Sequence, residues 1–263
     1  MKLVLDPGGT RLKFGAVRNG QLDAVHSVDW LELQSGRFDP ATLARETGTP
    51  ANESGLEVHV LNRKAPPAAG EEWLSVFCQA WGKPAATREV IDPLQNAGFD
   101  IAYTSGHPGS DRIAAAVACQ RKDPGGSFII VDAGTCITVD LLSPGSWRGG
   151  AIMPGLQLQA NAMKKAGLPI LQADDQHHWP FTEGPEGALG RNTMDAIAAG
   201  IPWATRKSVE AIAQAYKVMD PCAQVVLTGG DAPHFDGVGG WQTFANPNLV
   251  LQGCAMLLNE HTT

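Results

Sequence analysis

Residues 3–17 read LVLDPGGTRLKFGAV, and residues 129–142 read IIVDAGTCITVDLL. Each stretch has a short apolar run, an aspartate, a tight turn with glycine and threonine, and then alternating polar and apolar residues. Alternation with a period of two is typical of a β-strand. Each stretch therefore predicts a strand, a turn and a second strand that pairs back on the first.

The repetition of this pattern predicts two related halves, each opened by one copy. A chain of 263 residues is long enough for one large domain or for two of about 130 residues each. The strongest linker signal is Asp123-Pro124-Gly125-Gly126, where composition and turn chemistry change together. We therefore predict an α/β protein with one domain at residues 1–122 and another at residues 123–263.

Hydrophobic periodicity predicts the other elements more coarsely. The Asn19-Gly20 turn favours a third strand over residues 21–28. Residues 101–110 and 149–154 read as loop and turn. Further strands are expected at residues 56–61 and 225–227, and helices at residues 39–47, 71–81, 111–122, 156–166 and 248–259, with two more within 187–216.

Composition excludes several classes of protein. With 43% hydrophobic and 18% charged residues, the chain reads as a soluble protein with a core, and its formal charge of −7 disfavours a nucleic-acid partner. It contains no apolar run of about 18 residues, so no membrane span is expected. Its five cysteines are widely spaced and odd in number, which favours free thiols and a cytoplasmic location.

The first turn has the chemistry of a phosphate site. Gly8 and Gly9 can adopt positive φ and let backbone N–H groups approach an anion, and Thr10 adds a hydroxyl donor. Lys13 follows on the return strand, within reach of phosphate oxygens. Asp6 at the strand end suits a hydrated Mg²⁺, which proteins usually hold with one or two carboxylates. The plain alternative is an ordinary hairpin turn.

A second and a third turn strengthen the nucleotide reading. The copy at Asp132–Thr135 could clamp phosphates from the other side of a cleft, and Thr228-Gly229-Gly230 after an apolar strand would let adenine or ribose approach the backbone. Neither a Walker A motif nor a dinucleotide fingerprint follows the first strand.

Two pre-helix turns carry further candidates. In Gly109–Arg112, Asp111 is either a helix cap or a general base, beside an arginine suited to anions. A helix N-terminus also favours a substrate carboxylate. In Gly190–Thr193, Asn192 or Thr193 is either a cap or a substrate contact.

Six short motifs, in their order along the chain, closely resemble those of the type III pantothenate kinases, some of which are named Bvg accessory factors. The motifs are LVLDPGGTRLK, GSDR, VDAGT, GGAIMPGL, GRNT and LTGGDA. The resemblance covers residues 1–17 and about 101–256, and residues 30–95 carry none of its motifs. It implies two related ribonuclease H-like domains of the acetate and sugar kinase/Hsp70/actin superfamily, with ATP in the cleft between them. It also implies ATP-dependent phosphorylation of pantothenate to 4′-phosphopantothenate, the first step of coenzyme A biosynthesis.

The resemblance assigns roles to matching residues. Asp111 would be the catalytic base, Asp132 would bind a monovalent cation (K⁺ or NH₄⁺), and Asp6 would hold Mg²⁺ through water. A homodimer is implied, with substrate near its interface. ATP and its phosphates would contact Asp6, Pro7, Gly8, Gly9, Thr10, Arg11, Leu12, Lys13, Thr135, Gly229 and Gly230. Pantothenate would contact Tyr103, Gly109, Ser110, Asp111, Arg112 and Thr193.

One position departs from the family pattern. The family usually has Asp-x-Gly-Asn-Thr/Ser in the first hairpin, and this chain has Gly9 in place of the asparagine. That change removes an amide side chain that would help to position ATP or substrate, whereas the backbone loop should survive. Two other functions stay open on the residues alone: a kinase for a sugar or a short carboxylic acid, and a non-enzymatic regulatory protein on the same fold.

Overall fold

The computed structural model describes residues 2–18, 21–39, 57–62, 69–70, 72–81, 87–104, 106–174 and 178–258. The chain forms two compact units. Unit 1 contains Met1–Gly98, His107–Lys122 and Asn248–Thr263, and unit 2 contains Phe99–Gly106 and Asp123–Pro247. The predicted helix at residues 39–47 lies outside the described residues apart from Asp39.

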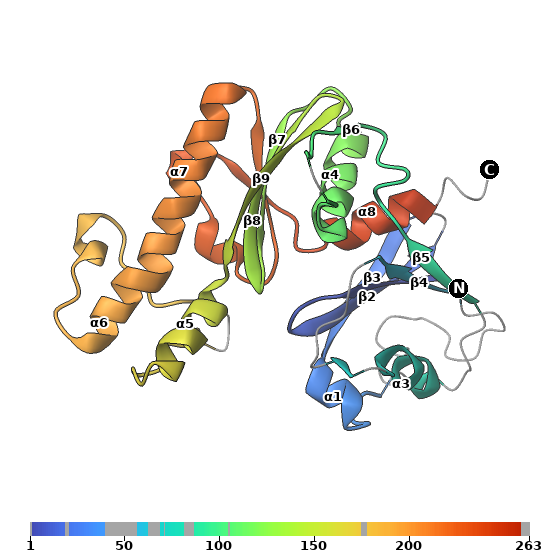
Figure 1. Ribbon diagram of the computed structural model, residues 1–263, viewed down its shortest axis with the longest axis horizontal. Coiled ribbons are helices and arrows are strands. Elements are labelled where there is room, and N and C mark those ends of the chain that lie inside the picture. The colour runs from blue at the N-terminus through green and yellow to red at the C-terminus, as the bar shows by residue number, and fades with distance from the viewer. Residues whose placement is uncertain are drawn as a thin grey trace. The chain divides into compact units, whose positions relative to one another are not determined.

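Unit 1 is built on a five-stranded sheet with the order β3-β2-β1-β4-β5 (Figure 1). Strands β1, β2 and β3 are antiparallel neighbours, while β4 pairs with β1 in parallel and β5 with β4 in parallel. The bounds are β1 Lys2–Pro7, β2 Arg11–Arg18, β3 Gln21–Asp29, β4 Glu57–Leu61 and β5 Thr87–Ile91.

The two faces of this sheet pack against different helices. Leu3 and Leu5 of β1, with Leu12 and Phe14 of β2, point into a core that Trp30 and other apolar side chains of α1 and α3 complete. Helix α8 contacts β1, β2, β3 and β5, and it packs along α4. Figure 1 shows α1 and α3 on one side of these strands and α8 on the other. The bounds are α1 Trp30–Gln34, α3 Trp73–Ala80, α4 Ser110–Lys122 and α8 Leu249–Leu258.

Unit 2 repeats the same strand order. Its sheet runs β11-β10-β7-β8-β9-β6, so that β7, β8, β9, β10 and β11 correspond to β1, β2, β3, β4 and β5, with β6 added at the edge. The parallel and antiparallel pairings match as well. The bounds are β6 Asp100–Ile101, β7 Phe128–Ala133, β8 Cys136–Ser143, β9 Ser146–Pro154, β10 Gln224–Thr228 and β11 Thr243–Ala245.

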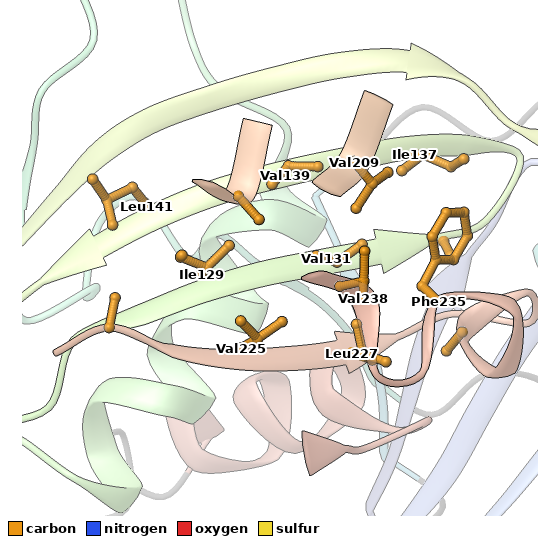
Figure 2. Close-up of a cluster of buried hydrophobic side chains, with 14 residues drawn as sticks. Ile129, Val131, Ile137, Val139, Leu141, Val209, Val225, Leu227, Phe235 and Val238 are labelled. Carbon is orange, nitrogen blue, oxygen red and sulfur yellow. The ribbon is translucent and has the colours of Figure 1, made fainter. Parts of the chain in front are cut away.

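One face of the second sheet carries the main core of unit 2. Figure 2 shows Ile129 and Val131 of β7 with side chains from β8 and β10 on this face, where Val209, Phe235 and Val238 cover them. Helix α7 is amphipathic and buries Val209 and Ala213 against the strands. The bounds are α5 Leu156–Lys165, η2 Pro185–Ala188, α6 Thr193–Ala198, η3 Ala199–Trp203, α7 Ala204–Met219, η4 Ala232–Phe235 and η5 Val238–Gly240.

The two compact units are not continuous in sequence. Unit 1 includes α8 from the end of the chain, and unit 2 includes residues 99–106. Residues 149–154 were expected as a turn and are part of strand β9. Within the described ranges, no helix is long and apolar enough to cross a membrane.

Candidate active site

Asp6 lies at the carboxyl end of β1, on the face of the sheet opposite the Leu3 and Leu5 core. Its side chain is buried, with 6% exposure. Lys13 of β2 is its register partner, so the ammonium and the carboxylate project from the same face of the hairpin. A buried carboxylate and a half-buried cation thus lie at the strand end, where α/β sheets usually bind ligands.

The start of α4 is tied to the same edge of the sheet. Strand β4 runs parallel to β1, and Asn62 follows its last residue. The buried hydroxyl of Ser110 donates a hydrogen bond to the Asn62 carbonyl oxygen. Asp111 follows in the first helical turn, where its Oδ1 accepts a hydrogen bond of 3.0 Å from the backbone N–H of Arg112. Asp111 therefore lies inside the helix and is not its cap.

Cys254 on α8 is fully buried, and the carboxylates of Asp6 and Asp111 both affect its thiol. Burial raises the pKa of its thiol well above the usual value, and the carboxylates of Asp6 and Asp111 raise it further. Both carboxylates therefore act on one fully buried atom between the sheet and α4. The hydrogen bond from Ser110 to Asn62 places Asp111, which follows Asp6 by 105 positions in the sequence, at the same edge of the sheet as Asp6.

Two hydrogen bonds hold the turn between β1 and β2. The Gly8 N–H donates to the Asp6 carbonyl oxygen at 2.9 Å, and the Gly8 carbonyl oxygen accepts from Trp30 Nε1 at 3.0 Å. Gly8 does not use the positive φ that glycine permits. A Cβ at Gly8 would lie 2.8 Å from the Arg11 carbonyl oxygen, so close approach explains the glycine. Leu12 is buried in the core and offers only its backbone to a ligand.

In unit 2, the second and third turns meet at the ends of two parallel strands. Asp132 of β7 and Thr228 of β10 are register partners. Gly229 has φ +93°, and a Cβ there would lie 2.3 Å from the Ala133 carbonyl oxygen. The Asp231 N–H donates to that same oxygen at 2.9 Å. The turn at residues 228–231, here called the TGGD turn, therefore lies directly on the Asp132–Thr135 turn.

Helix α5 starts against the same turn. The N–H of Gly155 donates to the Thr135 carbonyl oxygen at 3.0 Å. A Cβ at Gly155 would lie 2.2 Å from the Gly134 carbonyl oxygen, so only glycine fits. Three short motifs that are distant in sequence thus form one backbone-lined surface in unit 2, with Thr135 exposed on it.

The close approach at Gly229 leads to a prediction. The resemblance assigns Gly229 to ATP, and Gly229→Ala would strain a positive φ and push the TGGD turn off Ala133. With that assignment, KM for ATP should rise about tenfold in steady-state assays. Gly145→Ala is the matched control, because Gly145 has φ +70° but nothing within 4 Å of its added Cβ. Equal KM values for ATP in the two variants would contradict a role for the close packing of Gly229 on the Ala133 backbone.

The remaining substrate candidates lie in unit 2. Tyr103 is 44% exposed, and its ring lies 5.7 Å from that of Trp147. Thr193 is exposed at the start of α6, and the cap of that helix is Asn192, whose side chain accepts from the Asp195 N–H at 2.9 Å. Neither Tyr103 nor Thr193 is hydrogen-bonded to the Asp132–Thr135 turn in the part of the chain that the structure describes.

The donor set fits a divalent ion that is held mainly by other ligands. Among the described residues, no group of three or more His, Cys, Asp or Glu side chains could hold a metal ion. Mg²⁺ is commonly bound through one or two carboxylates, phosphate oxygens and water. A single buried aspartate beside a lysine suits that arrangement and not a structural metal site.

The chain is similar to proteins of one family over most of its length. The family model for type III pantothenate kinase matches residues 2–215. A type III pantothenate kinase of Alkalilimnicola ehrlichii is 32% identical over 268 residues, and one of Bacteroides fragilis is 36% identical over 267; each match covers 98% of both chains.

Solved structures share the fold. A Baf family protein from Campylobacter jejuni aligns with a TM-score of 0.58 at 18% identity, covering 99% of this chain and 98% of that one. The activator of a 2-hydroxyisocaproyl-CoA dehydratase from Clostridium difficile aligns with a TM-score of 0.51 at 13% identity, covering 99% and 97%. These likenesses and the repeated strand order confirm the predicted α/β fold of the acetate and sugar kinase/Hsp70/actin type. The family model matches residues 2–215, and the alignments with the two relatives cover nearly the whole of each chain. The chain therefore belongs to the type III pantothenate kinase family.

Proposed function

We propose that Asp111 is the general base in the ATP-dependent phosphorylation of pantothenate to 4′-phosphopantothenate, the first step of coenzyme A biosynthesis. Membership of the family over residues 2–215 supports that reaction for this chain. The observation that carries the assignment of Asp111 is its place in the first turn of α4, whose Ser110 hydroxyl binds the Asn62 carbonyl oxygen at the sheet edge where Asp6 ends β1. A base beside a phosphate and metal site is what transfer to an alcohol needs.

The ATP phosphates are assigned to the turn from Asp6 to Lys13, where backbone N–H groups and the Lys13 ammonium neutralise their charge. Asp6 holds Mg²⁺ through water, and the ion neutralises phosphate charge when it is bound. Thr135, Gly229 and Gly230 are assigned to the nucleotide, because the turns that carry them present backbone at close approach.

Pantothenate is assigned to the start of α4. Its carboxylate pairs with Arg112, because a guanidinium binds a carboxylate bidentately and because the N-terminus of a 13-residue helix favours an anion. Gly109 and Ser110 form the backbone there. Tyr103 and Thr193 are assigned to the same substrate as further contacts from unit 2.

A monovalent cation, K⁺ or NH₄⁺, is assigned to Asp132. The support is a half-buried carboxylate at the end of β7 that lies beside Thr228 and below the TGGD turn. Carboxylate, hydroxyl and carbonyl oxygens are hard ligands of the kind that alkali cations take.

The chain is further proposed to act as a homodimer in the cytoplasm. Large apolar side chains are exposed on β9, on α5 and around α6, which is unusual for a surface that stays in water. They are Ile152, Leu158, Leu189 and Met194. All five cysteines are free, which fits a reducing compartment. Sedimentation equilibrium distinguishes a dimer from a monomer.

The substrate assignment is tested with a panel of acceptors. Coupled ATP consumption is measured with pantothenate, with hexoses and with short hydroxy acids. The proposal expects turnover with pantothenate and a kcat/KM at least about 100-fold lower for the others, because Arg112 would lose its carboxylate partner or the alcohol would miss Asp111. Preference for a hexose would contradict it.

A further inference from the structure

The carbonyl group of Gly8 is held by a side chain that no motif singles out. Trp30 Nε1 donates to it at 3.0 Å across 22 positions of sequence. The Trp30 side chain is 2% exposed, and its ring meets that of Trp73 edge-on with centroids 5.6 Å apart. A donor fixed by core packing therefore points at the first turn.

Strand register explains how Trp30 reaches this turn. In the β2–β3 pair, Arg11 lies opposite Asp29 and Leu12 opposite Val28. Asp29 caps α1 by accepting a hydrogen bond of 2.9 Å from the Leu31 N–H, and so makes Trp30 the first residue of that helix. Trp30 thus begins its helix next to the start of β2, under the turn.

The hydrogen bond from Trp30 to the Gly8 carbonyl oxygen sets the direction of the Gly9 N–H. A trans peptide unit is planar, and its C=O and N–H point in opposite directions. Since the Gly8 carbonyl points to Trp30 and the core, the Gly9 N–H of the same peptide unit points away from them. The Gly9 N–H has no hydrogen-bond partner among the residues that the structure describes, and Gly9 is exposed.

Two successive glycines make this peptide unit easy to rotate. Glycine loses more backbone entropy on ordering than any other residue and adopts many φ values. The peptide unit of a Gly-Gly turn therefore rotates easily. The family's asparagine, which would restrict the second position, is replaced here by Gly9. A hydrogen bond from a buried indole supplies a restraint that the turn itself lacks.

We propose that Trp30 is a positioning residue for the ATP site: its indole N–H fixes the Gly8–Gly9 peptide so that the Gly9 N–H faces the ATP phosphates. Trp30 does not touch the nucleotide. The proposal rests on the assignment of the Asp6–Lys13 turn to those phosphates.

The chain offers a matched control. Trp81 is in the same apolar cluster and is 7% exposed, but its Nε1 has no hydrogen-bond partner among the described residues. Trp30→Phe and Trp81→Phe remove the same group from the same core, and only the first removes a bond to the turn. A third protein carries the benzothiophene analogue of tryptophan at Trp30, which keeps the ring shape and lacks the N–H.

The experiment measures the dissociation constant of a non-hydrolysable ATP analogue, KM for pantothenate and the thermal midpoint. Trp30→Phe and the benzothiophene protein should weaken analogue binding about three- to tenfold, the range expected for one lost hydrogen bond, with KM for pantothenate changed less than twofold. Trp81→Phe should lower the thermal midpoint without weakening the analogue.

Three results would overturn the proposal: unchanged analogue binding in the benzothiophene protein, equal weakening by Trp81→Phe, or an equal rise in KM for pantothenate. The benzothiophene protein keeps the test valid if Trp30→Phe fails to fold. Lys13→Ala distinguishes failure of the phosphate assignment of the turn from failure of the role of Trp30. If it leaves analogue binding unchanged, the phosphate assignment of the turn fails; if it weakens binding and the Trp30 variants do not, only the role of Trp30 fails.

Discussion

Asp111→Asn is expected to lower kcat by about 10²- to 10⁴-fold, the usual contribution of a general base. Asparagine keeps the Oδ1 acceptor for the Arg112 N–H, so the start of α4 should stay in place. It cannot accept the proton of the pantothenate hydroxyl. Rapid-quench measurement of phosphopantothenate with saturating ATP gives the rate, and titration calorimetry should show nearly unchanged ATP binding.

Asp23→Asn is the control for this experiment. Asp23 lies in the same unit on β3, and its 3.2 Å ion pair with Arg18 is largely exposed, so its loss should change little. If Asp111→Asn turned over at close to the rate of Asp23→Asn, Asp111 would not be the base. A large loss of ATP binding in Asp111→Asn would instead indicate a role in nucleotide binding.

The second large effect is on stability, at the contact between α4 and α8. A Cβ at Gly253 would lie 1.9 Å from the Ala114 carbonyl oxygen and 2.6 Å from its carbon, so the two helix backbones are in direct contact there. Both helices are buried on this side. Gly253→Ala must push them apart, and α4 carries Asp111 and Arg112 at its start.

Gly253→Ala should lower the free energy of unfolding by about 3 kcal/mol, at the upper end of the cost of overpacking a core. The loss should occur although alanine favours a helix by about 1 kcal/mol over glycine. Gly200→Ala is the control, because Gly200 is exposed in a helical segment with nothing within 4 Å of an added Cβ. Urea denaturation measures both, and equal midpoints would show that α4 and α8 do not depend on this contact.

Sequence patterns predicted the central strands because these strands carry apolar runs or clear alternation. Strands β1, β2, β7, β8 and β10 followed from local alternation and apolar runs. Three of the strands that we missed lie at the sheet edges: β5 has five residues, β11 three and β6 two. A short edge strand is held by backbone hydrogen bonds to one neighbour, so its side chains carry little periodic signal.

Strand β9 was missed for a different reason. Gly149 and Gly150 suggest a turn, but Gly149 takes φ +103° next to a register shift opposite Leu141 and Leu142. Gly150 is required because a Cβ would lie 2.2 Å from Asp140 Oδ1 on β8. Glycine here permits a bulged strand, and sequence alone does not separate a bulge from a turn.

The candidate site was predictable where one motif holds its own residues together. The hairpin that carries Asp6 and Lys13 followed from alternation. The packing of Gly229 on Ala133 was not predicted, because it depends on the parallel pairing of β7 with β10. The role of Trp30 at Gly8 was not predictable, because it depends on the β2–β3 register and on a cap at Asp29. The place of Asp111 at the same sheet edge as Asp6 likewise depends on the hydrogen bond between Ser110 and Asn62 and on α8, which returns from the end of the chain.

The most direct measurement of the central claim is product formation from pantothenate and MgATP by the purified chain, followed by mass spectrometry in potassium and in sodium salts. The predicted result is 4′-phosphopantothenate, formed faster with potassium and lost in Asp111→Asn. Binding of ATP with no phosphopantothenate in either salt would contradict the account.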